Sequence, residues 1–501
     1  MKRRSFLKST AAAAALAGLG DFEFLGKLPR VSAAEARLPA QLVKLHPEVE
    51  SLVRLLEETP RERVLDEFAA RVKQGTTYRE ILAAILLAGV RNIQPRPVGF
   101  KFHAVLVVNS AHLASLSSPD TDRWLPIFWA IDQFKSSQAR DVEEGDWAMG
   151  AVDESAVPAS HLAKRALINA MDNWDEAAAD VAIVGLCRTA GAHEIFEILS
   201  RYGMRDFREI GHKAIYVANS FRTLEAVGWQ HAEPVLRSLV YALLDRDGEK
   251  SNPAKSDLAA DRPFRRNLEL VKDLGSGWLD GKPSGDATRE MLQVIRRGSP
   301  VEASTKAVEL LNRGVAAQSL YDAFFCGAGE LLMRFPGILS LHASTFTNAM
   351  HYCFQRCRDE ETRKLLVLQN AAFLPLFRGN NPDKGMRIDS MEPAPIDKEK
   401  PDAIADIFAD VSKDRLRASR KLLQHLQSNP DPKPFADAAR RLIFLKGRDS
   451  HDYKFSSAIL EDCHFMTPPW RDRFLAASTF YLKGSGDPDN QLAQRIRSAL
   501  A

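Results

Sequence analysis

Apolar side chains recur at helical spacing along almost the whole chain, and this pattern constrains the fold more than any other feature. Apolar residues repeat every three to four positions in the segments 80–90, 103–116, 177–186, 212–224 and 232–244. This spacing gathers apolar groups on one face of a helix, and no alternating β-branched run interrupts it. The sequence therefore predicts an all-α protein, a multi-helical stack with mostly short connections.

An internal repeat predicts two tandem duplicated halves. The segments 102–112 and 341–351 share the pattern His-Ala-x4-Asn-x2-His, and the same offset of 239 positions also superposes His212 on His451. Coincidence among alanine-rich helices is the alternative, but matches of rare residues at one constant offset favour duplication. We expect a first helical half at 35–245, a linker and connecting segment at 246–299, and a second helical half at 300–501. Irregular stretches are expected at 136–158, 246–262 and 378–401, where Pro, Gly, Asp and Lys accumulate.

The segment 1–34 is typical of an export signal. Lys2-Arg3-Arg4-Ser5-Phe6-Leu7-Lys8 is a twin-arginine pattern, a mild apolar run follows to Leu19, and small residues at 31–34 provide a cleavage site. The alternative is an uncleaved basic leader or anchor. Cleavage predicts a periplasmic protein whose partner in export is the twin-arginine machinery, with no membrane span after removal of the signal.

Charge and cysteine usage exclude several classes of protein. The chain has 68 basic and 65 acidic residues, and the mature part is nearly neutral without a basic run, so no nucleic-acid partner is expected. Its 5 cysteines show neither a dense disulfide framework nor a zinc-finger spacing. At 501 residues the chain can bury large cores without such staples.

A polar stripe on the segment that starts at His212 is the first candidate site. At 100° per residue, His212, Tyr216 and Asn219 share one direction with Thr223, while apolar residues occupy the others. Buried polar groups cost a few kcal/mol each unless they find partners. The stripe therefore faces a ligand, ordered water or a structural hydrogen-bond network, and the sequence leaves these alternatives open.

The segment 103–116 is the second candidate, because His103, Asn109 and His112 interrupt an apolar helix. His103 and His112 point to opposite sides of a regular helix, so they cannot both bind one metal ion. We expect no metal; if one is present, His112 and His212 converging across helices are the expected ligands. Histidine is suited to proton transfer near neutral pH, so His112, His212 and Tyr216 form a plausible acid–base set. For each histidine, the alternative is a core residue bonded to a backbone carbonyl.

Familiar cofactor motifs are missing from the sequence. It has no Gly-x-Gly-x-x-Gly after a strand, no phosphate loop, no Gly-x-Ser-x-Gly, no His-Glu-x-x-His and no Cys-x-x-Cys-His. We therefore expect no Rossmann-bound NAD or flavin, and the sequence identifies no other cofactor.

Three histidine-bearing segments resemble the questin oxidase-like proteins. Leu341-His342-Ala343-Ser344-Thr345 is similar to the Leu-His-x-x-Thr segment of that family, and the segments 211–236 and 102–116 resemble two other helices of it. The resemblance implies an all-helical oxygenase that opens aromatic polyketide quinones by a Baeyer–Villiger-type oxygen insertion, and it adds His342 to the candidate site. Lys213 stands where the family is expected to prefer Pro. The family's reductant, NADPH, is confined to the cytoplasm, so an exported member requires a different reductant or substrate.

Two hypotheses follow for the function. The first is an exported oxidoreductase that binds an aromatic or quinone-like small molecule, with His112 and His212 as bases and Tyr216 and Asn219 holding its oxygens. The second is a non-catalytic helical-repeat binding or scaffold protein whose polar stripe only joins helices.

Overall fold

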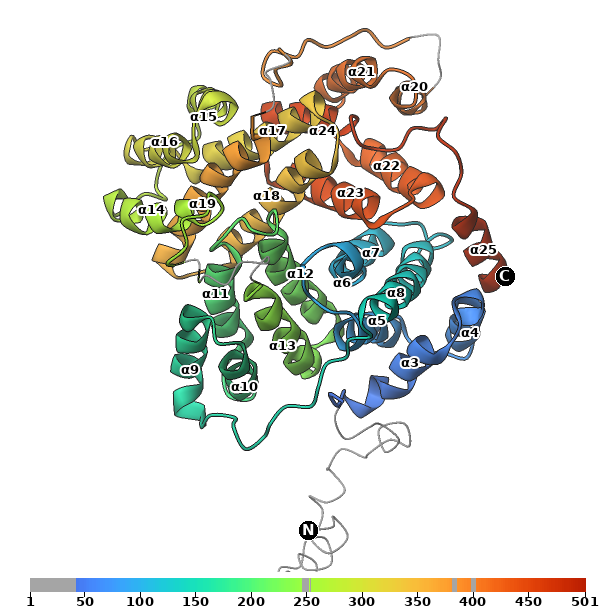
Figure 1. The fold of residues 1–501 in the computed structure, drawn as a ribbon. Coiled ribbons are helices and arrows are strands. Elements are labelled where there is room, and N and C mark those ends of the chain that lie inside the picture. The colour runs from blue at the N-terminus through green and yellow to red at the C-terminus, as the bar shows by residue number, and fades with distance from the viewer. Residues whose placement is uncertain (1–41, 246–251, 253, 381–384, 398–401) are drawn as a thin grey trace, which may run out of the picture.

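The computed structural model describes residues 42–245, 252, 254–380, 385–397 and 402–501, and its regular structure is helical throughout this part of the chain (Figure 1). The predicted signal segment lies outside the described residues. The helices of the first half are α3 (Pro47–Glu58), α4 (Arg61–Lys73), α5 (Tyr78–Asn92), η2 (Phe100–Phe102), α6 (His103–Leu106), α7 (Val108–Leu116), α8 (Leu125–Glu144), α9 (Ser160–Asn173), α10 (Glu176–Cys187), α11 (Ala192–Gly203), α12 (His212–Val227), η3 (Trp229–His231), α13 (Ala232–Leu243) and α14 (Arg262–Leu270).

After η4 (Val271–Asp273), the second half continues in the same manner. Its helices are α15 (Gly285–Arg297), α16 (Pro300–Asn312), α17 (Ala317–Arg334), α18 (Ile338–Arg356), α19 (Glu360–Arg378), α20 (Ala403–Val411), α21 (Arg415–Ser428), α22 (Lys433–Lys446), α23 (Ser450–Asp462), η5 (Cys463–Phe465), α24 (Pro468–Ser478) and α25 (Gln491–Leu500). No helix in the described part of the chain combines the length and apolar character needed to cross a membrane.

The prediction of an all-α fold is confirmed, with local differences. Side-chain caps set several helix starts: Thr77 and Glu80 form a capping box at α5, and Asp449 accepts backbone N–H bonds at the start of α23. The expected helix 103–116 is divided at Val107 into α6 and α7. The irregular stretch expected from residue 136 begins only after Glu144, because α8 continues to that residue before Gly145 ends it at a φ of 138°.

The order of helices repeats along the chain at the offset that the sequence motifs share. α4 begins at Arg61 and α16 at Pro300, and α5 begins at Tyr78 and α17 at Ala317, so both pairs of first residues lie 239 positions apart. The same correspondence relates α3 to α15, α8 to α19, α10 to α21, α12 to α23 and α13 to α24. The expected connecting segment 246–299 is thus not only a linker, because it contains α14 and also α15, the counterpart of α3.

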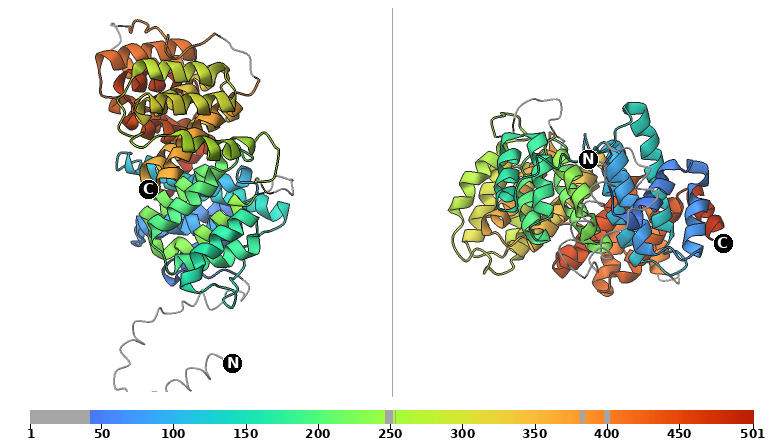
Figure 2. Two further views of the ribbon diagram at one scale, coloured as in Figure 1. Left: turned by 90° about the vertical axis from the view of Figure 1, so that its left-hand side faces the viewer. Right: turned by 90° about the horizontal axis from the view of Figure 1, so that it is seen from below.

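The two halves pack against each other through helices that also contact their own half. α12 of the first half contacts α18 of the second, and α23 of the second contacts α7 of the first. The last helix of each half also crosses over, since α14 packs on α16 and α19 while α25 packs on α4 and α8. In Figure 1, α25 lies beside α4, and Figure 2 shows the halves stacked one above the other. One continuous apolar core joins both halves.

A charge-reversed pair at equivalent positions illustrates the pseudo-symmetry. In the first half Arg91 on α5 binds Glu57 on α3 with an Nη2–Oε2 distance of 2.8 Å. In the second half the corresponding helices carry Glu330 and Arg296, with an Nη2–Oε2 distance of 2.6 Å. The arrangement of the two helices is the same, but the charges have changed places.

We expect Arg91→Met to destabilise the protein strongly, because Glu50 is completely buried and would lose its guanidinium partner. Removing one member of a buried ion pair typically costs about 3–5 kcal/mol. Urea-induced unfolding followed by circular dichroism measures this. The matched control is Arg54→Met on α3, whose pair with the exposed Glu58 should be worth less than about 1 kcal/mol. Equal effects of both substitutions would contradict the expectation.

Candidate metal centre

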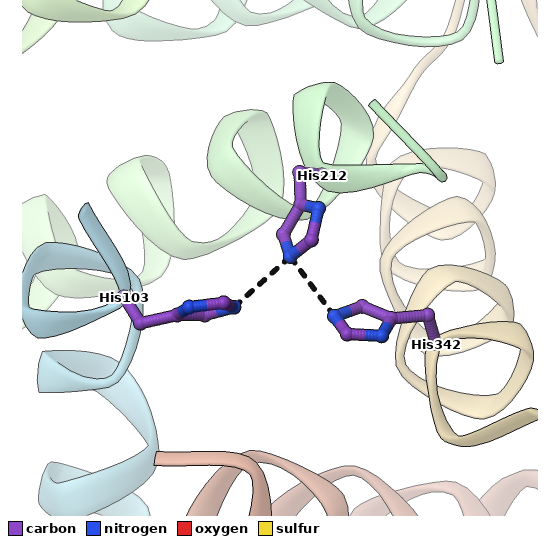
Figure 3. A group of neighbouring side chains, drawn as sticks. All are labelled: His103, His212 and His342. Atoms are coloured by element: carbon purple, nitrogen blue, oxygen red, sulfur yellow. Dashed lines mark hydrogen bonds between the residues drawn. The ribbon is translucent and has the colours of Figure 1, made fainter. Parts of the chain in front are cut away.

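Three histidines meet where helices of the two halves cross (Figure 3). His103 is the first residue of α6, His212 is the first residue of α12, and His342 lies in the first turn and a half of α18. The Nε2 atom of His212 is 3.0 Å from Nε2 of His103 and 2.9 Å from Nε2 of His342. All three side chains are buried, and the three ring nitrogens lie within 4.8 Å of one another.

Glycines allow the approach of the backbone to this cluster. Gly211 precedes α12 at a φ of +84°, and a Cβ there would lie 2.6 Å from the ring of Phe346. Gly99 packs directly on the His212 imidazole, where a Cβ would be 3.4 Å from Cε1. A side chain at position 211 would strain the backbone and collide with Phe346. Because glycine has no side chain, the start of α12 can lie close to α18.

Backbone carbonyls determine the tautomer of all three imidazoles. Nδ1 of His103 donates to the carbonyl of Phe100 at 2.8 Å, that of His212 to Glu209 at 2.8 Å, and that of His342 to Ile338 at 2.7 Å. A carbonyl oxygen is only an acceptor, so each Nδ1 carries the hydrogen, and in a neutral ring Nε2 then bears a lone pair. Three lone pairs thus face one another without a hydrogen between them.

The surroundings keep these rings neutral. Burial lowers the pKa of His103, His212 and His342 well below the ordinary value of 6.5, and the nearby Lys454 ammonium lowers each further. A proton shared within the cluster is therefore disfavoured near neutral pH. A metal ion between the three Nε2 atoms would satisfy their lone pairs, and histidine ligands commonly have Nδ1 held by a carbonyl in this way.

A fourth histidine completes a pseudo-symmetric arrangement. His451 on α23 is the repeat counterpart of His212, as His342 is that of His103. Its ring centre is 4.7 Å from that of His103 and 5.3 Å from that of His342, matching the 4.4 Å and 5.0 Å that His212 makes with His342 and His103. Its Nδ1 lies 3.5 Å from Asp449, whose pKa falls to about 2 mainly through a hydrogen bond to His451.

A buried lysine lies beside the cluster. Lys454 has no hydrogen-bond partner for its Nζ among the described residues, and burial lowers its pKa to about 7. It lines a polar cavity of about 20 Å³, which is room for about one water molecule. Asn109, Asn219, Arg222, Asn348 and Glu461 line the same cavity.

The remaining predicted site residues divide into two groups. Asn109 and Asn219 line the small cavity, and Asn219 donates to the carbonyl of Leu106 at 2.9 Å. The Tyr216 hydroxyl donates to Ser238 at 2.8 Å, and burial raises its pKa, so it stays protonated. Thr223 donates to the carbonyl of Asn219 at 2.7 Å. Most of the polar stripe is therefore a hydrogen-bond network, and in this stripe only His212 presents an unprotonated nitrogen to the cluster.

The ligand pair His112 and His212 requires correction. His112 lies on α7, where its Nδ1 is hydrogen-bonded to the Tyr78 hydroxyl at 2.9 Å, and it does not join the cluster. The residue that does is His103, on the opposite side of the segment 103–116, as the helical geometry requires. The candidate ligand set is thus His103, His212 and His342.

Sequence reasoning missed His451 and Lys454 as site residues. The 239-residue offset pairs His451 with His212, and this was the available signal for the histidine. Lys454 has no such signal, because its repeat counterpart is Ile215 and a lysine in a helix normally lies in solvent.

Comparisons with protein-family models, with curated proteins and with solved structures found no match to this chain.

We expect the stability of the metal-free protein to fall as the pH decreases below about 6.5. The unfolded imidazoles take up protons there, whereas burial keeps the folded ones neutral, so the unfolded state binds more protons. For three rings the loss is up to about 4 kcal/mol per pH unit. Urea unfolding between pH 7.5 and 5.5 measures it. A variant with all three histidines replaced by Gln should lose this part of the slope. It should keep the part due to His112, His231 and His351, whose pKa values burial also lowers. Equal slopes in the two proteins would contradict the assignment.

Proposed function

We propose that this protein is an exported, metal-dependent oxidoreductase that acts on an aromatic or quinone-like small molecule. The observation that carries the proposal is the convergence of three unprotonated Nε2 atoms, from His103, His212 and His342, in a buried site. Neutral imidazoles with their Nδ1 atoms held by carbonyls are pre-oriented metal ligands, and preparing such a site without an ion would leave three lone pairs unsatisfied.

The chemistry of the donors is compatible with a redox-active ion. His103, His212 and His342 would hold the ion through their Nε2 atoms, and imidazole nitrogens bind iron and copper as well as zinc. Bound there, iron or copper would supply one-electron chemistry. We infer iron or copper because the family resemblance implies oxidative chemistry. His451 lies beside these three ligands, with its ring centre 4.7 Å from that of His103.

The chain's own residues give this centre its reactivity. His103, His212 and His342 are neutral ligands, and no carboxylate belongs to the described ligand cluster, so an ion held there would keep its full charge as a Lewis acid toward the substrate. Phe100, Glu209 and Ile338 hold the imidazoles through their carbonyls, and burial excludes competing water. The pKa of Lys454 is about 7, so near that pH a part of the molecules carries a neutral amine there. A neutral amine repels a neighbouring cation less than an ammonium group does.

The oxidative part of the proposal is supported by the resemblance to the questin oxidase-like proteins. Three segments of this chain resemble that family. Leu341–Thr345 contains His342, and the segments 102–116 and 211–236 contain His103 and His212. The three clustered imidazoles therefore come from the three similar segments. That family uses NADPH, which an exported enzyme lacks. We therefore propose that the substrate, a phenol or hydroquinone, supplies the electrons itself and that dioxygen accepts them. A hydroquinone would lose two electrons and two protons to become a quinone, and dioxygen would take them up to become hydrogen peroxide.

The twin-arginine signal fits a protein that acquires its metal before export. This route transports folded proteins, often with the cofactor inside, and the described ligands come from α6, α12 and α18, which meet only after folding. Cytoplasmic loading would thus select the ion before the protein reaches the periplasm.

We expect about one iron or copper ion per chain in protein purified after export, measured by elemental analysis and ultraviolet–visible spectroscopy. His342→Ala should reduce the metal content by at least about tenfold, because second-shell changes alone cost 10–100-fold in affinity. The matched control is His112→Ala, which should retain the metal. Stoichiometric zinc would instead favour hydrolytic chemistry, and a metal-free protein with unchanged spectra would overturn the proposal.

A second substitution separates this function from a scaffold role. His212→Gln should abolish metal binding and substrate oxidation while changing the melting temperature of the metal-free protein by only a few degrees, since the bonds of Tyr216 and Asn219 remain. Differential scanning calorimetry and a screen of phenols and hydroquinones measure the two effects. If the metal-free protein lost stability strongly and no oxidation occurred in the parent chain, the scaffold hypothesis would be preferred.

A further inference from the structure

A second concave site lies at the opposite end of α12 from the histidine cluster. It has a volume of about 390 Å³, within the range of small-molecule sites. α11, α12 and η3 of the first half and α18 of the second form its walls. From His212 to Leu224 the helix advances roughly 18 Å, so this pocket is separate from the metal centre.

Four aromatic side chains line the pocket: Phe196, Phe221, Trp229 and Tyr352. Phe196 contacts Phe221 and Tyr352 edge to face, with ring centres 4.8 Å and 5.8 Å apart, and Phe221 lies 6.0 Å from Trp229. Trp229 remains only partly buried at the wall. Gly228, at a φ of +114°, makes the turn that brings it there, and a Cβ at that position would collide with Arg79.

Two charged side chains and one histidine lie at the mouth of the pocket: Glu225, Arg356 and His193, whose Nε2 is 3.0 Å from the backbone carbonyl of Arg356. Glu225 and Arg356 form an ion pair with an Nη1–Oε1 distance of 2.9 Å, and 53% and 54% of their side chains are exposed. An ion pair this exposed contributes at most about 1 kcal/mol, so a ligand can exchange for it at little cost. α12 and α18 both end here, and the partial negative charge of their C-termini adds to the attraction for an ammonium group.

The second half shows that the fold does not need this lining. At the 239-residue offset, the counterparts of Phe221, Trp229 and Tyr352 are Leu460, Pro468 and Leu113, and only Phe196 meets another aromatic residue, Phe435. Glu225 and Arg356 correspond to His464 and Ser117. The same helices therefore pack without the aromatic walls and without the charge pair.

We propose that this pocket binds an aromatic amino acid, with the ring between the aromatic walls, the ammonium group on Glu225 and the carboxylate on Arg356. Ring stacking explains the four aromatic side chains, and the zwitterionic head explains why opposite charges meet at the mouth. The proposal does not depend on the metal centre.

The test uses four probes that share one ring system: L-tryptophan, tryptamine, indole-3-acetate and indole, titrated calorimetrically into the full-length mature protein. Each charged contact should improve affinity about two- to fivefold, so L-tryptophan should bind about tenfold more tightly than indole. The two singly charged probes should lie between them. Absence of binding, or equal affinity for all four, would overturn the proposal.

Variants assign each contact. Glu225→Gln should remove the advantage of tryptamine over indole and leave that of indole-3-acetate, and Arg356→Gln should do the reverse. Both side chains are exposed, so folding should be preserved. Trp229→Leu should weaken all four probes, whereas Trp147→Leu, which changes another partly buried tryptophan that lies outside the pocket, should weaken none. Equal effects of the last two variants would show binding elsewhere and contradict the proposal.

Discussion

Each clustered imidazole donates its Nδ1 hydrogen to a carbonyl near the start of its own helix, and the arrangement of the site depends on this bond. The bond does not displace a backbone hydrogen bond, because a carbonyl oxygen has two lone pairs: the carbonyl of Glu209, for example, accepts both the backbone N–H and the Nδ1–H of His212. It leaves Nε2 unprotonated and aims it away from the backbone. With three such rings buried in one place, a cation is the partner that completes their bonding.

The duplication explains why the histidines meet at the centre of the molecule. The two halves have the same helix order and meet through α12, α18 and α23, so repeat-related residues come together near one axis. Arg222 and Glu461, which are 239 positions apart, form an ion pair of 2.8 Å there. Because of this axis, one repeated motif contributes both His103 and His342 to the cluster. The halves also differ, since the buried Lys454 occupies the position that is equivalent to Ile215 in the first half.

A comparison of equivalent positions in the two halves helps to distinguish structural residues from candidate functional ones. Positions that both halves need retain their character, as in the reversed pair Arg91–Glu57 and Glu330–Arg296, where the interaction persists although the charges change sides. The aromatic lining of the pocket at the end of α12 is not repeated in the second half, apart from Phe196 and its counterpart Phe435, so the shared fold does not require it. The candidate metal centre thus uses residues of both halves near the axis, whereas the lining of the aromatic pocket is specific to one end of α12.

The sequence by itself determined the helices and the repeat, because helical spacing of apolar residues and caps such as Thr77 act over a few neighbouring residues. It also marked His103 and His212 as polar residues in apolar helices, and the family resemblance added His342. Only the tertiary structure decided that these three meet, that His112 turns instead to Tyr78, and that Tyr216 bonds Ser238. These contacts join different helices, 22 residues apart for Tyr216 and Ser238 and 130 residues apart for His212 and His342. They depend on how the helices cross and rotate against one another, which the spacing of residues within one helix does not specify.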